Sequence, residues 1–394
     1  MIFGRRIAVV CIAALPVILQ GNGAFAQNPN PQTPPYAQMD PNAVDYRGPG
    51  RAPSSDITGK TAVIGILLAL QGNGAEQGQA LLKAAQQAIT DENKNGPLAD
   101  GRSFSLAVRN EAGSWGQSSS EMMRLISEDQ SLALIIGTEG NLAHQAEQIA
   151  NKLGIPIVTL ASDATTTEIN IPWIFRVVPS DRQQAQVIAQ AIHDKDKTAK
   201  VLLISTTDHD GRVGKAAFLQ SMRTSGAAAP VELDIDPEIV DTGQARDALN
   251  STRSSVVVFW TDSLVFEELL DTVQRARSVR TIYASEKSAQ PLLANPAADA
   301  ANTVIRVPML GQSTAQPGVP EQVYNAVRLI AAAIRAGGPN RARVRDALAR
   351  STVNVQSESA PMFDGAGNLL AKPQLVPVDS GAPSQRIGSS GDVR

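Results

Sequence analysis

Short apolar runs alternate with longer amphipathic segments from about residue 60 to residue 285. A run of four to nine mostly apolar residues predicts a buried strand, and apolar residues recurring every three or four positions predict a helix. The predicted strands are 62–70, 104–109, 132–136, 155–160, 201–205, 231–235, 256–260 and 281–284. The predicted helices are 78–93, 118–128, 142–153, 214–226, 242–250 and 266–278. Two successive strand–helix blocks predict an α/β fold of two doubly wound, Rossmann-like lobes with parallel sheets.

The first 26 residues have the three parts of a secretory signal peptide. Arg5 and Arg6 precede an apolar run at 7–19, and Ala24-Phe25-Ala26 forms a small-x-small cleavage pattern. The alternative is a membrane anchor, but a bilayer span needs about 20 apolar residues. We therefore expect cleavage after residue 26 and a periplasmic location.

Both ends of the exported chain have the composition of linkers. Residues 27–60 are rich in Pro, Asn, Gln and Gly, and residues 380–394 are similar. Proline cannot donate a backbone hydrogen bond, so the first segment is predicted to be an extended linker and the second a disordered tail. The folded part is then 61–379.

Composition excludes several classes of function. The formal net charge is −3 and aromatic residues make up 4% of the chain, which argues against a nucleic-acid partner. The single cysteine, Cys11, lies in the predicted signal peptide, so no internal disulfide or zinc–thiolate site is expected.

A glycine pattern, Gly72-x-Gly74-x-x-x-Gly78, follows the first predicted strand and resembles a dinucleotide-binding fingerprint. Its third glycine is one residue late, and no acidic residue ends a second strand about 20 positions further on. We interpret it as a tight turn with a close backbone approach, and no cofactor is predicted.

The chain has three histidines, His144, His193 and His209. We interpret His144 and His193 as solvated. The Asp208-His209-Asp210 triplet could bind a metal weakly, but one local cluster is poor evidence, and a polar loop after a strand is the simpler interpretation. No metal site is predicted, and without a nucleophile–base pair the chain is not expected to be an enzyme.

Five segments stand out when they are taken in order along the chain. They are Ile64-Gly65-Ile66-Leu67, Leu134-Ile135-Ile136-Gly137, Ala161-Ser162-Asp163-Ala164-Thr165, Phe175-Arg176-Val177-Val178-Pro179-Ser180-Asp181 and Phe363-Asp364-Gly365-x-Gly367-Asn368. Together they resemble type 1 periplasmic solute-binding proteins of branched-chain amino-acid ABC transporters, the family of leucine/isoleucine/valine-binding proteins.

The resemblance implies two lobes that close on a small-molecule ligand, and an ABC transporter permease that receives it. It also implies a monomer, the usual state in this family. The implied lobes are residues 61–178 plus 308–360 and residues 179–307 plus 361–379, with crossings near 177–181, 304–308 and 360–364.

The resemblance also implies ligand-binding residues. In the first lobe, Asn141 stands where the family has a serine that holds an α-carboxylate. Asp163, Ala164 and Thr165 lie in a loop similar to the family's Ala-Thr loop, in which the Asp163 carbonyl would accept from an ammonium and Thr165 would contact the ligand. Glu286, from the second lobe, matches the glutamate that pairs with the ammonium.

Each of these positions also has a simpler interpretation. Asn141 could be an ordinary helix N-cap, and Thr165 could cap the segment that follows its Thr-rich turn. Glu286 could be a solvated loop residue paired with Lys287.

The sequence departs from the family at positions that usually carry aromatic residues. Gln77, Asp210 and Ser263, or its neighbour Asp262, stand there instead. A pocket with fewer aromatic and more acidic groups favours a polar or cationic ligand over leucine, and Asp210 becomes a candidate contact. The alternative is a sensing or interaction protein with an altered or lost ligand site.

Overall fold

The computed structural model describes residues 55–111, 115–168, 171–294, 303–310, 319–355 and 358–378. The predicted signal peptide, most of the predicted linker and the predicted tail lie outside the described residues. Within the described part of the chain, no helix is both long and apolar enough to cross a membrane.

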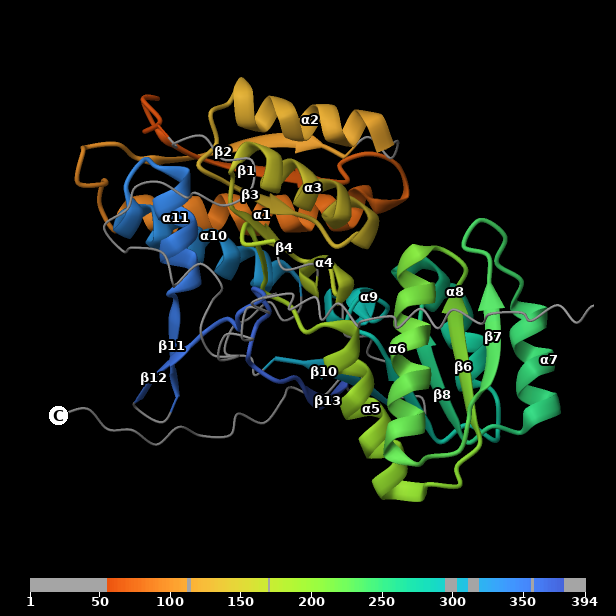
Figure 1. Ribbon diagram of the computed structural model, residues 1–394. Helices are drawn as coiled ribbons and strands as arrows, with labels where there is room; N and C mark the ends of the chain where they lie inside the picture. Colours follow the sequence, from red (N-terminus) through yellow and green to blue (C-terminus); the bar gives the residue numbers. More distant parts are fainter. Residues whose placement is uncertain are drawn as a thin grey trace, which may run out of the picture.

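The first sheet has five parallel strands in the order β2-β1-β3-β4-β5. Helices α1, preceded by the short 3-10 helix η1, and α10 pack on one face, and α2 and α3 pack on the other (Figure 1). The strands are β1 (Ala62–Leu68), β2 (Phe104–Asn110), β3 (Ala133–Ile136), β4 (Ile157–Thr159) and β5 (Ile174–Arg176). The helices are η1 (Gly72–Gly74), α1 (Ala75–Lys94), α2 (Trp115–Ser127), α3 (Gly140–Leu153), α4 (Thr165–Glu168), α10 (Val319–Gly337) and α11 (Arg341–Ala349).

The second sheet has six strands in the order β13-β10-β9-β8-β6-β7. Helices α5 and α6 cover one face, and α7, α8 and α9 cover the other. The strands are β6 (Val201–Thr206), β7 (Val231–Ile235), β8 (Val256–Trp260), β9 (Thr281–Ala284), β10 (Val304–Met309) and β13 (Gln374–Val378). The helices are α5 (Asp181–Asp196), α6 (His209–Ser225), α7 (Thr242–Thr252), α8 (Ser263–Gln274) and α9 (Gln290–Ala294). A separate hairpin joins β11 (Thr352–Val355) and β12 (Glu358–Pro361).

The predicted α/β architecture of two doubly wound lobes is confirmed. One strand differs from the prediction of parallel sheets, because β13 runs antiparallel to β10 at the edge of the second sheet. Each sheet has helices packed on both faces, and the inner strands, such as β3 and β8, carry near-continuous apolar runs for that reason.

Helices α6 and α8 begin earlier than their apolar periodicity predicts, because polar capping residues start them. Asp208 accepts a hydrogen bond from the Gly211 amide and starts α6 at His209. Asp262 does the same for α8 through the Val265 amide, 2.8 Å away. The interpretation of 208–210 as a polar loop is therefore wrong for His209 and Asp210, which form the first turn of α6.

The glycine pattern after β1 forms a close backbone approach, as predicted. A Cβ added to Gly78 would lie 1.8 Å from the carbonyl oxygen of Ala69, so only glycine fits this position on α1 without a shift of the backbone. Gly72 has a φ of 72°, a left-handed conformation that glycine adopts without strain.

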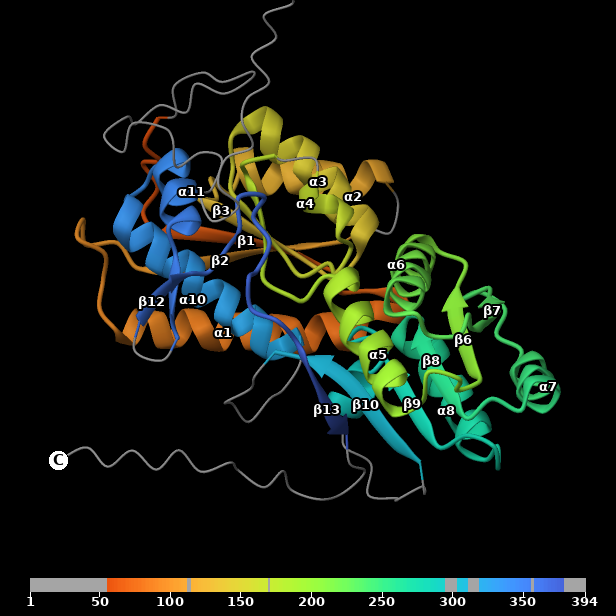
Figure 2. The ribbon, with the colours of Figure 1, turned by 60° about the horizontal axis from the view of Figure 1, so that its bottom comes forward.

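In each sheet, successive strands are added first on one side and then on the other. This reversal falls between β1 and β3 in the first sheet and between β6 and β8 in the second. Open α/β sheets bind ligands beyond the carboxyl ends of the strands at such a switch point. The loop after β3 leads into α3 and the loop after β6 leads into α6. Helices α3 and α6 contact each other, and both views show α6 beside α3 (Figure 2). The two switch points therefore meet.

Candidate functional site

The first turns of α3 and α6 are joined by a charged cluster. The backbone N–H of Gly140, the first residue of α3, donates to the Asp210 carboxylate on α6, with N–O distances of 3.1 and 3.4 Å. Lys287, in the turn after β9, reaches Asp210 at 2.5 Å and Glu139 at 2.8 Å. Burial lowers the pKa of Lys287, but the two carboxylates more than offset this and hold it well above its ordinary value.

Two histidines from different lobes converge on one buried carboxylate. Asp163, in the loop after β4, has its Oδ2 3.0 Å from His144 Nε2 on α3 and 2.7 Å from His209 Nε2 on α6. Its Oδ1 accepts from the backbone N–H of Thr165 at 2.8 Å and from the Thr165 hydroxyl at 2.7 Å. Burial raises the pKa of Asp163, but these hydrogen bonds outweigh it and hold the pKa well below its usual range.

The interpretation of His144 as a solvated residue is wrong. Its Nδ1 lies 3.0 Å from Oε1 of Glu147, a residue only 4% exposed, and its Nε2 faces Asp163. Hydrogen bonds to the Asp163 and Glu147 carboxylates raise the pKa of His144 to about 10. A one-turn spacing on α3 brings His144 and Glu147 together, because residues three apart share one helix face.

The predicted ligand residues around α3 and α4 are already engaged by protein groups, except Asn141. Asn141 is exposed on α3, and the N-cap of that helix is Glu139, so the N-cap alternative for Asn141 is wrong. The Asp163 carbonyl accepts from the Arg176 guanidinium and from the Thr166 hydroxyl, and the Ala164 carbonyl accepts from the Thr167 hydroxyl. Thr165 does not cap the next segment, because Asp163 accepts its amide instead.

Glu286 lies in a second, separate group of contacts. It is 3% exposed, and its carboxylate accepts from the side-chain amide of Gln322 on α10 at 2.6 Å. Its backbone N–H donates to Oε1 of Gln184 on α5 at 2.8 Å. Burial raises the pKa of Glu286 to about 8. The alternative of a solvated glutamate paired with Lys287 is wrong, since Lys287 pairs with Asp210 and Glu139.

A small cavity remains between these groups. Its volume of about 20 Å³ exceeds the roughly 10–15 Å³ that one water molecule needs, but is far below that of an amino-acid pocket. It is lined by Thr138, Leu160, Ser162, Val178, Gln184, Glu286, Lys287 and Gln322. In this arrangement of the lobes the predicted ligand groups, apart from Asn141, are therefore occupied by other protein groups.

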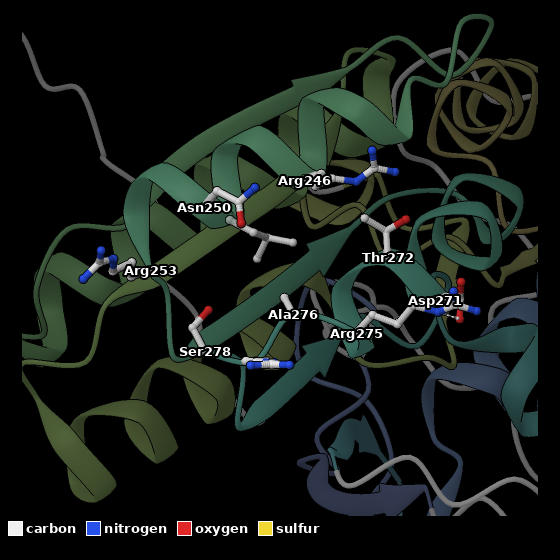
Figure 3. Close-up of a pocket in the computed structure, with 10 residues that line it drawn as sticks. Arg246, Asn250, Arg253, Asp271, Thr272, Arg275, Ala276 and Ser278 are labelled. Atoms are coloured by element: carbon white, nitrogen blue, oxygen red, sulfur yellow. Dashed lines mark hydrogen bonds and ion pairs between the residues drawn. The ribbon is translucent and has the colours of Figure 1, made fainter.

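Two larger cavities lie elsewhere in the described part of the chain. One, of about 670 Å³, opens between α7 and α8, and Figure 3 shows arginine side chains around it, with Asp271 paired to Arg275 at 2.8 Å. No predicted site residue lines it. The other, of about 550 Å³, runs between α5 and α6, with Ala164 and Thr165 among its lining residues.

Sequence reasoning missed His144, His209 and Lys287 as members of the cluster and Gln184 and Gln322 as partners of Glu286. The position of His209 could have indicated its role, because His209 follows a predicted strand at the sheet edge where the parallel strands end. His144 carried a second signal, the carboxylate one helical turn later at Glu147. The glutamines carried none.

Two comparisons with known proteins give matches, one to a family profile and one to solved structures of the same fold. The sequence profile described as "Periplasmic binding protein" matches residues 61–305. A search of curated proteins finds no match.

Similar solved structures include a solute-binding protein of an ABC transporter from R. palustris in complex with benzoate. It has 18% identity and a TM-score of 0.69, covering 82% of this chain and 94% of that one. LivJ from Streptococcus pneumoniae, in complex with isoleucine, has 18% identity and a TM-score of 0.66, covering 82% and 97%. The leucine-binding protein LivK from Thermotoga maritima has 16% identity and a TM-score of 0.67, also covering 82% and 97%.

The matched profile spans well over half of this chain. The structural neighbours have the same fold as this chain over about four-fifths of its length. Proteins of this family are extracytoplasmic and bind solutes rather than transform them. Membership of the family therefore confirms the expectation that the chain is not an enzyme. The resemblance stated from the sequence motifs is confirmed as well: the chain belongs to the periplasmic binding protein family.

Proposed function

We propose that this protein captures a small polar solute of the amino-acid class between its two lobes and delivers it to the membrane permease of an ABC transporter. The observation that carries this proposal is the hydrogen bond that the Gly140 backbone N–H donates to the Asp210 carboxylate. A helix N-terminus offers unpaired N–H groups and a positive dipole end, and this one lies at a switch point and already binds a carboxylate.

The solute carboxylate would replace Asp210 at Gly140 when the lobes open. The ligands named for two of the structural neighbours, benzoate and isoleucine, both carry a carboxylate, which supports this choice. Thr165 and the carbonyl groups of Asp163 and Ala164 would lie on the first-lobe side of the solute, with Asn141 at the start of α3.

Glu286 would receive the ammonium of the solute. With its pKa at about 8, the carboxyl is largely protonated at neutral pH in this arrangement of the lobes. An ammonium beside it would favour the charged form, and a charge-assisted contact is strong and selective. Solute binding would then release a proton.

The remaining sequence-based predictions belong to the same proposal. They are a periplasmic location reached through the signal peptide 1–26, a monomer, and lobes limited to 61–178 plus 308–360 and 179–307 plus 361–379. Closure of the two lobes about their crossings would bury the solute, as in other hinged binding proteins.

A second candidate is a sensing or interaction protein on the same fold. The observation that favours it is the contact between Lys287, Asp210 and Glu139, together with the cavity of only about 20 Å³ beside Glu286. In such a protein these contacts would hold the lobes together permanently, and no solute would displace them.

A thermal-shift screen separates the two candidates. The exported chain is unfolded and refolded to remove bound solute, then screened with amino acids, aromatic carboxylates and, as controls, the matching amines that lack a carboxylate. A ligand that binds only the folded protein raises Tm by mass action. We expect a shift with one carboxylate class and none with its amine. No shift across the panel would contradict a solute receptor, and a stable partner in a pull-down would then support the second candidate.

Glu286→Gln tests whether Glu286 binds the ammonium of a solute identified in the screen. If Glu286 holds the ammonium, the variant weakens binding by roughly 1.5–3 kcal/mol in isothermal titration calorimetry. Unchanged affinity would remove Glu286 from the site.

A further inference from the structure

We propose that His144, Asp163 and His209 form a binding site for a divalent transition metal, with Zn²⁺ as the reference ion, and that the bound metal joins the two lobes. This goes beyond the proposed capture of an organic solute, because the metal is held by protein groups alone.

The three residues come from three separate segments of the fold. His144 lies on α3 and Asp163 follows β4, both on the first sheet, whereas His209 is the first residue of α6 after β6 of the second sheet. One potential ligand atom from each lies within 4.8 Å of the others. Among the described residues this is the one group of three or more His, Cys, Asp or Glu side chains that meets such a limit.

The donor set fits a borderline divalent metal. Two imidazole nitrogens and one carboxylate oxygen make a three-ligand zinc site that leaves a fourth position for water or another donor. Imidazole suits Zn²⁺, Ni²⁺ and Cu²⁺, whereas Ca²⁺ and Mg²⁺ prefer all-oxygen ligands.

A second layer of contacts orients the proposed ligands. Glu147 lies 3.0 Å from His144 Nδ1 and so directs the opposite nitrogen, Nε2, toward Asp163. Zinc-bound histidines typically donate their other ring N–H to a carboxylate in this way. The amide and hydroxyl of Thr165 hold Oδ1 of Asp163, which leaves Oδ2 for the two imidazoles. Asp163 is 2% and Glu147 4% exposed, so both carboxylates are held in place by their surroundings.

A metal would require a small expansion of the present geometry. Asp163 Oδ2 lies 3.0 Å from one imidazole nitrogen and 2.7 Å from the other. Tetrahedral zinc with bonds of about 2.0–2.2 Å separates neighbouring ligand atoms by about 3.3–3.6 Å. The two contacts of Asp163 would therefore lengthen by about 0.3–0.9 Å. The simpler use of the same atoms is a hydrogen-bonded network without metal.

Because His209 stands on the second lobe, the metal would have its full ligand set only when the lobes are together. A ligand that binds one conformation better shifts the population toward it. Metal binding would thus favour the closed arrangement and bring the adjacent Asp210 to Gly140.

Isothermal titration calorimetry on the full exported chain, freed of metal with EDTA and dialysed, tests the proposal with ZnCl₂ as the probe. We expect one Zn²⁺ per chain, and no comparable heat with Ca²⁺ or Mg²⁺. His144→Gln and His209→Gln should each weaken Zn²⁺ binding at least tenfold. His193→Gln is the matched control, since His193 lies at the exposed end of α5 beside Asp194, and it should change nothing.

Glu147→Gln tests positioning through His144 and should weaken Zn²⁺ binding about 10–100-fold while circular dichroism shows an intact fold. Small-angle scattering should show a compact form stabilised by Zn²⁺ in the wild type but not in His209→Gln. Absence of stoichiometric Zn²⁺ binding, or equal affinities in His209→Gln and His193→Gln, would overturn the proposal. The solute screen is run without metal, so a solute response with no Zn²⁺ binding rejects the metal site alone, and the reverse result rejects the solute receptor alone.

Discussion

The carboxylate of Asp210 accepts a hydrogen bond from the backbone N–H of Gly140, 3.1 Å away, and so joins the first turn of α6 to the first turn of α3. The two residues are 70 positions apart in sequence, and their helices follow strands of different sheets. Asp210 thus occupies the helix N-terminus that we assign to the solute carboxylate. A group of the protein and a group of the solute would compete for one place.

Replacing Asp210 with asparagine should therefore increase affinity for a carboxylate solute. The variant keeps the size of the side chain but removes its charge, and a charged hydrogen bond contributes about 1.5–3 kcal/mol. We expect the dissociation constant to fall by roughly tenfold or more, measured by isothermal titration calorimetry with the solute identified in the screen.

Asp234→Asn is the control for that measurement. Asp234, on β7, pairs with Lys215 of α6 at 2.7 Å, and among the described residues no hydrogen bond or ion pair joins it to α3. The control should leave solute affinity unchanged. Equal affinities for Asp210→Asn and the wild type would contradict the competition between side chain and solute.

Stability should decline as pH rises through the titration range of Glu286. Burial raises the pKa of this carboxyl to about 8, with a smaller contribution from the charge of Glu321, while the hydrogen bond from Gln322 lowers it. In the unfolded chain the pKa of glutamate is about 4.3. Between these values the folded state holds more protons than the unfolded state, so the free energy of unfolding falls with rising pH.

Urea unfolding of the wild type and Glu286→Gln at several pH values from about 5 to 8.5 isolates this contribution. Glutamine does not titrate and its carbonyl can still accept from Gln322, so the variant should lose less stability over this range. Glu268→Gln, an exposed position on α8, should follow the wild type. Parallel curves for all three proteins would rule out Glu286 as the titrating group.

The strands were predictable because their signal is local. Residues 256–260 and 281–284 are short apolar runs rich in β-branched and aromatic residues, and the structure places β8 and β9 there to the residue. The start of α6 could not be predicted from apolar periodicity, because its first turn, His209-Asp210-Gly211, contains no apolar side chain. The capping residue Asp208 was visible in the sequence, but its role depends on where β6 ends.

The contacts of the site could not be predicted from spacing. Asp163 and His209 are 46 residues apart, and Glu286 and Gln322 are 36 residues apart on different lobes. The switch-point rule places such residues at the edges of two sheets, but the partners depend on how the lobes meet. For the same reason a histidine on the polar side of a helix, His144, could be mistaken for a solvated one.

Arg176 at the end of β5 should be essential for stability. It is 1% exposed, and its guanidinium donates to the Asp163 carbonyl, to the Thr167 hydroxyl at 2.6 Å and to the Asn368 side chain. Burial lowers its pKa to about 10, so it stays charged at neutral pH. Arg176→Met leaves two buried acceptors and one partly buried acceptor without this donor and should lower the free energy of unfolding by about 3–5 kcal/mol.

Arg176→Lys keeps the charge but not the planar fork, and should still lose a large part of that stability. Arg275→Lys, at an exposed ion pair with Asp271, serves as the control and should unfold like the wild type. Guanidinium unfolding compares all four proteins. If Arg176→Lys had the same unfolding midpoint as the wild type, the positive charge alone, without the planar guanidinium, would be enough to hold Asp163, Thr167 and Asn368 together.

Gly78 on α1 should not tolerate a methyl group. An added Cβ would lie 1.8 Å from the Ala69 carbonyl oxygen and 2.7 Å from its carbon, so the backbone after β1 would have to move. Gly78→Ala should therefore lower the free energy of unfolding by about 1–3 kcal/mol, in the range of other overpacked sites. Gly116→Ala on α2 is the matched control, because a Cβ there meets nothing within 4 Å. Alanine favours a helix over glycine by about 0.5–1 kcal/mol, so this variant should be as stable as the wild type or more so. If both variants gained stability, helix propensity alone would govern these positions, and the close approach at Gly78 would be excluded as the reason for a glycine there.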